Sequence, residues 1–346
     1  MGGDVVPNVE RMGQTLIFRR SPVITAWASV AGKKEAEGPL GASFDLTAKQ
    51  TKLGASTWER AESRLQALAM QRLLQKREIG KDEVDLVFSG DLLNQCIGSS
   101  FFLRNTGLPS LGLYGACSTM AEALLLSGAF VNAGYARRAA ALTSSHFAAS
   151  ERQYRFPLGY GGQRTPTAQW TVTGAGAVLV EPQGEGPVIP MATVGTVRDK
   201  GIKDANNMGA AMAFAAYDTI RAHLRDTGRT VEDYDLIATG DLGKLGKAMV
   251  EALFRRDGVE LGGRYQDCGV LIYDANRQDT HCGGSGCGCS AVVLCADLLR
   301  RLRAGRIRRL LFCGTGALLS PVSVQQKRSV PAICHAVVIE RQEAKA

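Results

Sequence analysis

Four short segments of this 346-residue sequence occur twice in the same order, once in each half of the chain. The shift between copies ranges from 150 residues (Asp85 to Asp235) to 172 residues (Cys117 to Cys289), a spread that loop lengths explain. One such match arises easily by chance, but four in register indicate an internal repeat. We therefore expect two similar halves, residues 1–182 and 183–346, which meet in a connector rich in proline and glycine. The paired segments are 22–24 and 187–189, 85–92 and 235–242, Cys117-Ser118 and Cys289-Ser290, and Arg137-Arg138 and Arg308-Arg309.

Each half shows the same succession of hydrophobic patterns: strand, long helix, strand, buried helix and two further strands. The first long helix is expected to start at Ser56 or Thr57, where Ser56-Thr57-Trp58-Glu59 forms a capping box, and to end near Arg77. Residues 120–132 are apolar on nearly all sides, which indicates a helix buried between layers. The other expected elements are helices at 210–224 and 291–303 and strands at 85–89, 139–143, 175–180, 236–239 and 310–313.

Strands that alternate with helices in this way predict mostly parallel sheets covered by helices. The chain is long enough for a large core, and its 45% hydrophobic and 21% charged residues are typical of a globular protein. Two such halves, each with one buried central helix, predict an α/β fold, a duplicated five-layered α-β-α-β-α sandwich.

Composition argues against several classes of protein. Residues 1–9 lack the apolar core of a secretory signal peptide, and the most apolar stretch, 120–136, is too short to span a bilayer. We therefore expect a soluble chain that is cytosolic or peripheral on a membrane. The net charge of +8 comes without a basic stripe interleaved with aromatic residues, so nucleic acid is not an expected partner. The nine cysteines lack framework spacing, so most are expected to be reduced and buried.

The segment 111–122 places one cysteine, Cys117, at a bend between an apolar run and a helical pattern. Such a bend can set a thiol at the N-terminus of a buried helix, where the helix dipole favours the thiolate. Covalent acyl-transfer enzymes present their nucleophile in this way. The segment therefore raises the question of whether the partners for such chemistry are present.

Cys117 lies within the first of four motifs, which are Tyr114–Glu122, Phe156-Pro157 with 160–174, Gly283–Ala291 and Gly314–Pro321. A duplicated architecture with a cysteine heading the first central helix resembles the thiolase-like superfamily. Within it, these motifs resemble the stage V sporulation protein AD family of spore-forming bacteria, over about residues 14–340.

This resemblance implies a binding protein without enzymatic activity. Members of the family bind dipicolinic acid, a pyridine dicarboxylate, and serve the machinery that moves it, as its calcium chelate, into the developing spore. They act at the inner forespore membrane beside membrane-embedded sporulation proteins. Members of the superfamily also form homodimers through a sheet-edge strand near the nucleophile, for which Ser110–Tyr114 is the corresponding candidate.

A condensing enzyme or thiolase also needs His or Asn side chains that move protons and stabilise an oxyanion. In the superfamily these come from two loops of the second half. The first loop, residues 240–247, contains no His in this chain, and its Asp241 would repel a thiolate. The second loop contains His281 but lacks the usual Asn. We therefore predict no catalytic residue and a thiolase-like pocket kept for binding. Two alternatives remain: acyl transfer through Cys117, and a scaffold whose pocket is empty.

The residues predicted to contact the ligand are Cys117, Ser118, His146, Arg164 and His281. For Cys117 the alternative is a small residue required at a crowded helix start. For His146 it is a hydrogen-bonded core histidine, and for Arg164 a rim or dimer contact. Backbone N–H groups at two buried helix starts, Cys117-Ser118 and Cys289-Ser290, are further candidates for binding a dianion.

No metal and no cofactor is expected. His281 with Cys282, Cys287 and Cys289 lacks the spacing of a zinc site. The glycine run 283–288 lacks the ending of a phosphate-binding loop, so close helix packing explains it better.

A basic cluster surrounds the end of the second buried helix. Cations at a helix C-terminus complement its dipole and usually form a solvated face, but such a cluster can also meet anionic lipid or an acidic partner. Its members are Arg300, Arg301, Arg303, Arg306, Arg308 and Arg309.

Overall fold

Two five-stranded sheets with the same strand order form the frame of the computed structural model, which describes residues 9–154 and 164–342. Phe156-Pro157 and residues 160–163 of the second motif lie outside the described residues. The first sheet has the order β3 (Val23–Ala31), β9 (Gly174–Glu181), β7 (Ala139–Ser145), β5 (Leu86–Gly90) and β6 (Ser110–Leu113). The second has the order β10 (Val188–Thr193), β15 (Ala332–Glu340), β14 (Arg309–Ala317), β11 (Leu236–Thr239) and β12 (Tyr265–Asp267).

In chain order, the strands of the two halves take the same five positions, which supports the internal repeat seen in the sequence. β3 and β10 pair only at Val23 and Val188, so the two sheets join along one edge. The boundary expected after residue 182 lies in the turn between β9 and β10, and the division at that point stays an interpretation. Three shorter strands extend this frame: β1 (Val9–Met12), β2 (Thr15–Phe18) and β4 (Leu46–Thr47). A separate two-stranded sheet consists of β8 (Trp170–Thr171) and β13 (Gly284–Ser285).

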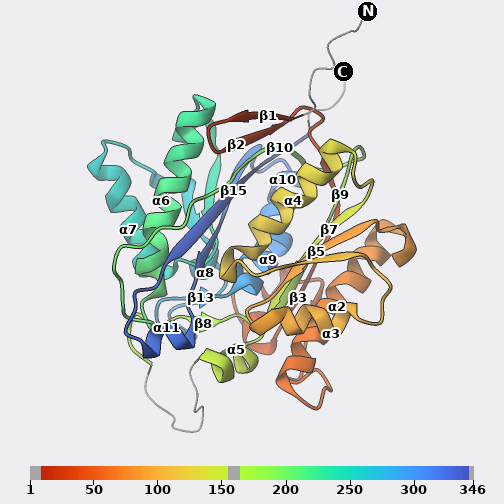
Figure 1. Ribbon diagram of the computed structural model, residues 1–346, viewed down its shortest axis with the longest axis horizontal. Coiled ribbons are helices and arrows are strands. Elements are labelled where there is room, and N and C mark those ends of the chain that lie inside the picture. Colours follow the sequence, from red (N-terminus) through yellow and green to blue (C-terminus); the bar gives the residue numbers. More distant parts are fainter. Residues whose placement is uncertain (1–8, 155–163, 343–346) are drawn as a thin grey trace, which may run out of the picture.

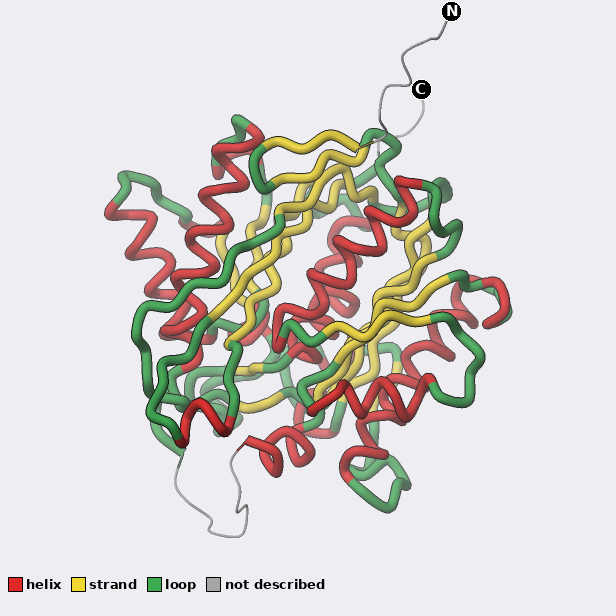
Figure 2. The backbone as a smooth tube through the Cα atoms, viewed as in Figure 1, coloured by secondary structure: helices red, strands yellow, loops and turns green. Residues whose placement is uncertain are grey.

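Helices cover the outer faces of both sheets and fill the space between them (Figures 1 and 2). α2 (Trp58–Arg77) and α3 (Ile97–Leu103) pack on the first sheet, and α6 (Met208–Thr227) and α7 (Gly243–Arg256) on the second. α4 (Thr119–Ala133) and the helix formed by α9 (Cys287–Val293), a π-helical turn and α10 (Leu299–Arg303) lie in the middle. The predicted five-layered fold is confirmed. The remaining helices are α1 (Lys33–Ala36), α5 (Phe147–Tyr154), α8 (Cys268–Leu271) and α11 (Pro321–Gln325).

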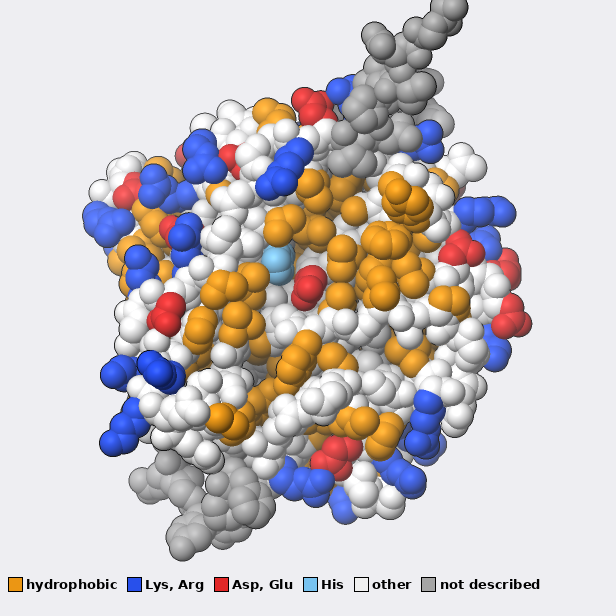
Figure 3. Space-filling view, viewed as in Figure 1, with side chains coloured by type: hydrophobic (Ala, Val, Ile, Leu, Met, Phe, Trp, Pro, Cys, Tyr) orange, Lys and Arg blue, Asp and Glu red, His pale blue; other side chains and the backbone are white. Residues whose placement is uncertain are grey.

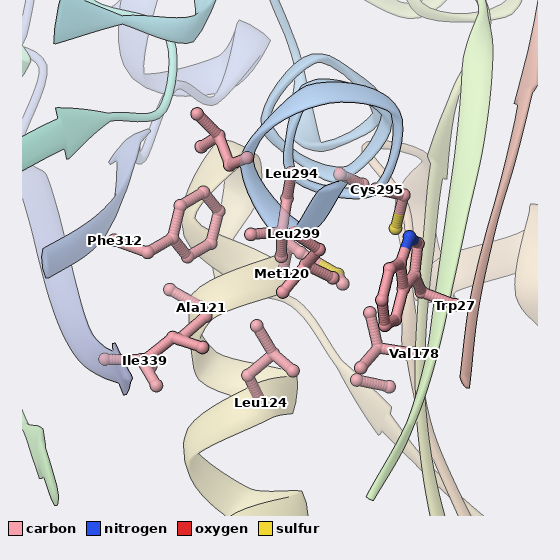
Figure 4. Packing of buried hydrophobic residues seen from close by; sticks show 14 of the residues in the cluster. Trp27, Met120, Ala121, Leu124, Val178, Leu294, Cys295, Leu299, Phe312 and Ile339 are labelled. Carbon is pink, nitrogen blue, oxygen red and sulfur yellow. The ribbon is translucent and has the colours of Figure 1, made fainter. Parts of the chain in front are cut away.

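The two central helices are buried against both sheets. Met120, Ala121 and Leu124 of α4 face Leu294 and Leu299 of the other helix, with side chains from each sheet on either side (Figure 4). The described stretch Ala116–Ala133 has the length and hydropathy of a membrane-spanning helix, but 67% of it is buried inside this fold. Burial among protein side chains accounts for its apolar composition.

Glycines on two strands let the central helices approach the sheets closely. A Cβ added to Gly176 of β9 would lie 2.6 Å from the carbonyl oxygen of Ala291. A Cβ on Gly314 of β14 would lie 2.6 Å from the Cβ of Ala121. Each half therefore contributes a glycine at the point where the central helix of the opposite half rests on its sheet.

The repeated Asp and Arg residues make the same contacts in both halves. The carboxylate of Asp85 accepts from the backbone N–H groups of Arg137 and Arg138, at 2.7 and 2.9 Å. Asp235 accepts from those of Arg308 and Arg309 at the same two distances. The recurrence of these residues in the sequence thus reflects a shared way of joining a loop to the start of β7 or β14.

Two helix starts differ from the sequence prediction. The hydroxyl oxygen of Thr57 caps α2 by accepting from the N–H of Arg60 at 3.3 Å. The predicted capping box is wrong, because it requires Glu or Gln three residues after the cap, and that residue is Arg60. The second central helix begins at Cys287 rather than near residue 291. All nine cysteines are free and buried, as predicted.

We predict that Gly176→Ala destabilises the fold by about 1–3 kcal/mol, because the added methyl group has no room against the backbone of Ala291. Urea unfolding followed by circular dichroism measures this change. Gly80→Ala is the matched control, since no atom lies within 4 Å of its added Cβ. Equal stability of the two variants would contradict the close helix packing.

Candidate functional site

Cys117 lies at the bend between β6 and α4, in a single 3₁₀ turn, Ala116–Ser118. The residue before it, Ala116, has a positive φ of 51°, which turns the chain sharply into the helix. The thiol borders a narrow cavity and is only 6% exposed. The bend predicted from the sequence is therefore present. The cavity is lined by Leu92, Ala116, Cys117, Ser150, Glu151, Tyr154, Thr171, Met208, Ser285, Ala317 and Leu319.

Asp241, in the loop between β11 and α7, faces Cys117 across the two halves. Its carboxylate accepts from the N–H of Gly286 at 2.8 Å, from the hydroxyl of Thr315 at 2.9 Å and from the thiol of Cys117. The side chain is completely buried. In the place where the superfamily resemblance implies a proton-transferring histidine, this protein has a buried carboxylate that accepts hydrogen bonds.

The electrostatics of this pair oppose a thiolate. Burial, the charge of Asp241 and the hydrogen bond to it raise the pKa of the Cys117 thiol well above its ordinary value of 9. Burial also raises the pKa of Asp241 to about 7, although its three hydrogen bonds lower it. Burial beside a carboxylate therefore keeps the proton on the sulfur of Cys117 and disfavours the thiolate.

The start of the second central helix is occupied by this same carboxylate. The sequence suggested the N–H groups at Cys289-Ser290 as candidates for binding a dianion, but these residues are not the first of the helix. The helix begins at Cys287, and the N–H of its N-cap residue, Gly286, donates to Asp241. A helix N-terminus binds an anion through such groups, and here the anion belongs to the protein.

Of the five residues predicted to contact one ligand, only Cys117 lines the cavity. Ser118 is fully buried and donates its hydroxyl to the carbonyl of Gly115 at 2.7 Å. His146 is also buried, with Nε2 2.8 Å from the carbonyl oxygen of Thr51 and its ring beside Trp58. Burial lowers the pKa of His146, so the ring is neutral at pH 7. The interpretation of His146 as a hydrogen-bonded core residue agrees with this placement.

Arg164 and His281 lie together, but in a separate cluster. Both contact the exposed carboxylate of Asp279, Arg164 through Nη2 and His281 through Nε2, each at 3.3 Å. The guanidinium of Arg164 also lies 4.7 Å from the ring centre of Trp170, which Phe147 stacks on. The prediction that these two side chains join Cys117 around one ligand is not supported by this arrangement, because neither lines the cavity.

Sequence reasoning missed α5 as a wall of the cavity. Ser150, Glu151 and Tyr154 come from this helix, and the Tyr154 hydroxyl donates to the carbonyl of Leu92. The hydroxyl of Ser150 is buried without a hydrogen-bond partner among the described residues. The i, i+1, i+4 spacing of these three residues could have indicated one helix face only once the helix was known to meet the cavity.

The described residues contain no group of three or more His, Cys, Asp or Glu side chains that could hold a metal ion. The cysteines near His281 point to different partners: Cys287 donates to the carbonyl of Ser144 and Cys289 to that of Gly240. Cys287 and Cys289 therefore lie against different parts of the fold.

Comparison with known proteins gives matches over almost the whole chain. The sequence profile of the family described as stage V sporulation protein AD matches residues 12–340. The chain is 45% identical over 328 residues to stage V sporulation protein AD of Bacillus subtilis (strain 168), covering 95% of this chain and 97% of that one.

Solved structures of condensing enzymes are similar in fold. The 3-oxoacyl-[acyl-carrier-protein] synthase III of Aquifex aeolicus VF5 has a TM-score of 0.56 and 11% identity, covering 92% of this chain and 99% of the other. Cerulenin-bound OleA of Xanthomonas campestris has a TM-score of 0.57 and 14% identity, covering 92% of this chain and 96% of the other. At such identities the likeness shows a shared thiolase-like fold and nothing about activity.

We predict that Asp241→Asn makes Cys117 at least about tenfold more reactive toward iodoacetamide at pH 8, because each unit by which the thiol pKa falls raises the thiolate fraction tenfold. Peptide mapping by mass spectrometry separates alkylation at Cys117 from that at the other cysteines. Asp279→Asn, which removes an exposed carboxylate from the Arg164 cluster, is expected to leave the rate unchanged. An unchanged rate for Asp241→Asn would show that this carboxylate does not keep the thiol protonated.

Proposed function

This chain belongs to the stage V sporulation protein AD family, and from that premise we propose that it binds dipicolinic acid and catalyses no acyl transfer. We propose further that it is a peripheral component, at the inner forespore membrane, of the complex that moves calcium dipicolinate into the developing spore. Membrane-embedded sporulation proteins would be its partners there. The family membership supports this role, and the site geometry supports the absence of catalysis.

The hydrogen bond from Cys117 to Asp241 is the single observation on which the non-enzymatic interpretation depends. A nucleophilic cysteine needs a partner that takes its proton or stabilises its charge, as a histidine does. A buried carboxylate does the opposite, since its negative charge disfavours a second one beside it. The fold thus keeps the position of the nucleophile while its chemistry is suppressed.

The charge of the cavity bears on the form of the ligand. Its described lining residues include the carboxylate of Glu151 and neither Lys nor Arg. Free dipicolinate carries two negative charges, whereas its chelate with one Ca²⁺ carries none. Calcium takes six to eight oxygen ligands. Dipicolinate leaves several of these positions open, and the carboxylate and hydroxyl oxygens on α5 are of the type that fills them. We therefore favour the chelate as the bound species.

A homodimer is part of the proposal, because β6 is an exposed edge strand. Only β5 pairs with it among the described strands, and Leu111 and Tyr114 are 47% and 51% exposed. Apolar side chains also gather in the middle of the face over α4 and the strands beside it (Figure 3). An unpaired apolar edge is usually covered in a native protein. Pairing with a second copy of this chain would cover it.

The alternative function is acyl transfer through Cys117, which the placement of the cysteine at the head of α4 favours. It predicts a covalent acyl-thioester on the intact protein after incubation with acyl-CoA. We expect no adduct on the wild-type chain. An adduct that Cys117→Ser abolishes would replace the binding proposal with an enzymatic one.

We predict that the purified chain binds calcium dipicolinate in isothermal titration calorimetry more tightly than it binds dipicolinate alone. Leu319→Trp, which places a large ring in the cavity, is expected to weaken binding at least about tenfold by steric exclusion. Val322→Trp is the matched control, because Val322 is 59% exposed and does not line the cavity.

Three results would count against this prediction. No heat from either species would overturn dipicolinate binding. Equal affinities of the two tryptophan variants would place the ligand outside the cavity. Tighter binding of the free dianion would reject the chelate as the preferred form.

We predict that Leu111→Lys shifts the protein from dimer to monomer in sedimentation velocity, because a charge on this edge is costly to bury against its own copy. Leu46→Lys, at a 39% exposed position on β4, is expected to leave the oligomeric state unchanged. A monomeric wild-type chain, or a Leu111→Lys variant that stays dimeric, would refute pairing through β6.

A further inference from the structure

A second hollow lies between the C-terminal ends of α2 and α10 and the start of β3. It consists of two adjoining depressions of about 590 and 470 Å³, which share Thr25, Trp27, Lys76 and Arg303 in their walls. Both are far larger than the narrow cavity at Cys117, which measures about 50 Å³. We refer to the two depressions together as the basic groove.

Cations outnumber carboxylates in the basic groove. Its walls carry five basic side chains and two acidic ones, Asp45 and Glu185. Asp45 lies 2.9 Å from Lys76 and 3.4 Å from Arg300, so it is engaged by the groove's own cations. Arg77 pairs with Glu181 at 2.7 Å. The basic residues are Lys76, Arg77, Arg300, Arg303 and Arg341.

Arg303 and Arg341 are different, because neither has an ion pair with any carboxylate among residues 9–154 and 164–342. Both are exposed. The guanidinium of Arg303 lies over the ring of Trp27 at 5.9 Å, which holds its stem against the wall of the groove. Arg341 follows the last strand, β15, and its guanidinium lies beside Gly305, just past the end of α10. Two guanidinium groups without a counter-ion in the described part of the chain thus border one hollow.

The helix dipole explains only part of this arrangement. Basic residues at the ends of α2 and α10 offset the partial negative charge of those termini, and Lys76, Arg77 and Arg300 are placed to do so. Arg303 is itself in the last turn of α10, and the guanidinium of Arg341 lies beside Gly305, just past the end of that helix, so both also lie near its C-terminus. The dipole supplies only a partial charge, and it leaves both guanidinium groups without a carboxylate partner among the described residues. Guanidinium groups without a carboxylate partner, placed in a hollow, can bind an oxyanion that carries several charges.

The basic groove is at the end of the molecule away from Cys117. The second central helix starts beside Asp241 and ends at Arg303, a run of 17 residues, or about 25 Å at 1.5 Å per residue. In Figure 1, α10 lies in the upper part of the molecule and α5 lies at the bottom. A ligand in the groove and one at Cys117 would therefore occupy the protein independently.

We propose that the basic groove binds a phosphate ester, with the guanidinium groups of Arg303 and Arg341 as the main contacts. A phosphate offers several charged oxygens, which two guanidinium forks can bind. Phosphates of this type occur on anionic phospholipid head groups and on soluble metabolites, and one set of contacts serves both. The proposal does not depend on dipicolinate binding, since it concerns other residues and another ligand.

The test compares two double variants with the same loss of charge. Arg303→Gln/Arg341→Gln changes the groove. Arg264→Gln/Arg277→Gln is the matched control, because both of its arginines are exposed, lie outside the groove and have no ion pair among the described residues. Cosedimentation with vesicles of phosphatidylcholine, with and without phosphatidylglycerol, tests the lipid source. Calorimetry with glycerol 1-phosphate tests the soluble source.

We expect the wild-type chain and the control to sediment with the phosphatidylglycerol vesicles and not with pure phosphatidylcholine. The groove variant is expected to bind them about thirtyfold more weakly. Binding of glycerol 1-phosphate that the groove variant loses, without vesicle binding, would support the same site with a soluble ligand. If both double variants lost vesicle binding equally, net charge alone would explain the loss, and the proposal would be overturned. Absence of binding to both probes would overturn it as well.

Discussion

Burial of two apolar helices between two sheets is the constraint on which the rest of this structure depends. Neither α4 nor the helix ending at α10 can expose its surface to water, so each half needs the other half's sheet to cover its helix. The close contacts at Gly176 and Gly314 show how tightly this space is filled. The same burial brings the starts of both helices to one place, and the site forms there.

At that place one carboxylate links the starts of the two central helices. Asp241 accepts from the thiol at the head of one central helix and from the N–H of Gly286 at the head of the other. One carboxylate therefore accepts from the thiol and also occupies the anion site of a helix terminus. Its removal from water raises its pKa to about 7, a cost that the surrounding hydrogen bonds offset in part.

Sequence patterns predicted the regular elements well and the site less well. The long apolar stretch at 120–132 and the repeated Asp-Arg contacts depend on local periodicity and on pairs of short segments, so they could be read from the chain. His146 and Arg164 were assigned to a ligand because each follows a buried strand or occupies a fixed turn. Such rules predict at which edge of a sheet a residue lies. They do not predict which neighbouring group forms a hydrogen bond or ion pair with its side chain. In this structure His146 contacts the carbonyl oxygen of Thr51, and Arg164 contacts the carboxylate of Asp279.

The sequence by itself determined the duplicated five-layered fold and the bend at Cys117, since both follow from hydrophobic periodicity and from a repeat with constant order. It also placed an acidic residue where a histidine would be needed. Only the tertiary structure decided which groups meet. Asp91 and Asp241 are repeat mates, yet Asp91 accepts from Ser99 in its own half while Asp241 reaches across to Cys117. Side-chain contacts between segments far apart in the chain depend on how the layers pack, and no local pattern encodes that geometry.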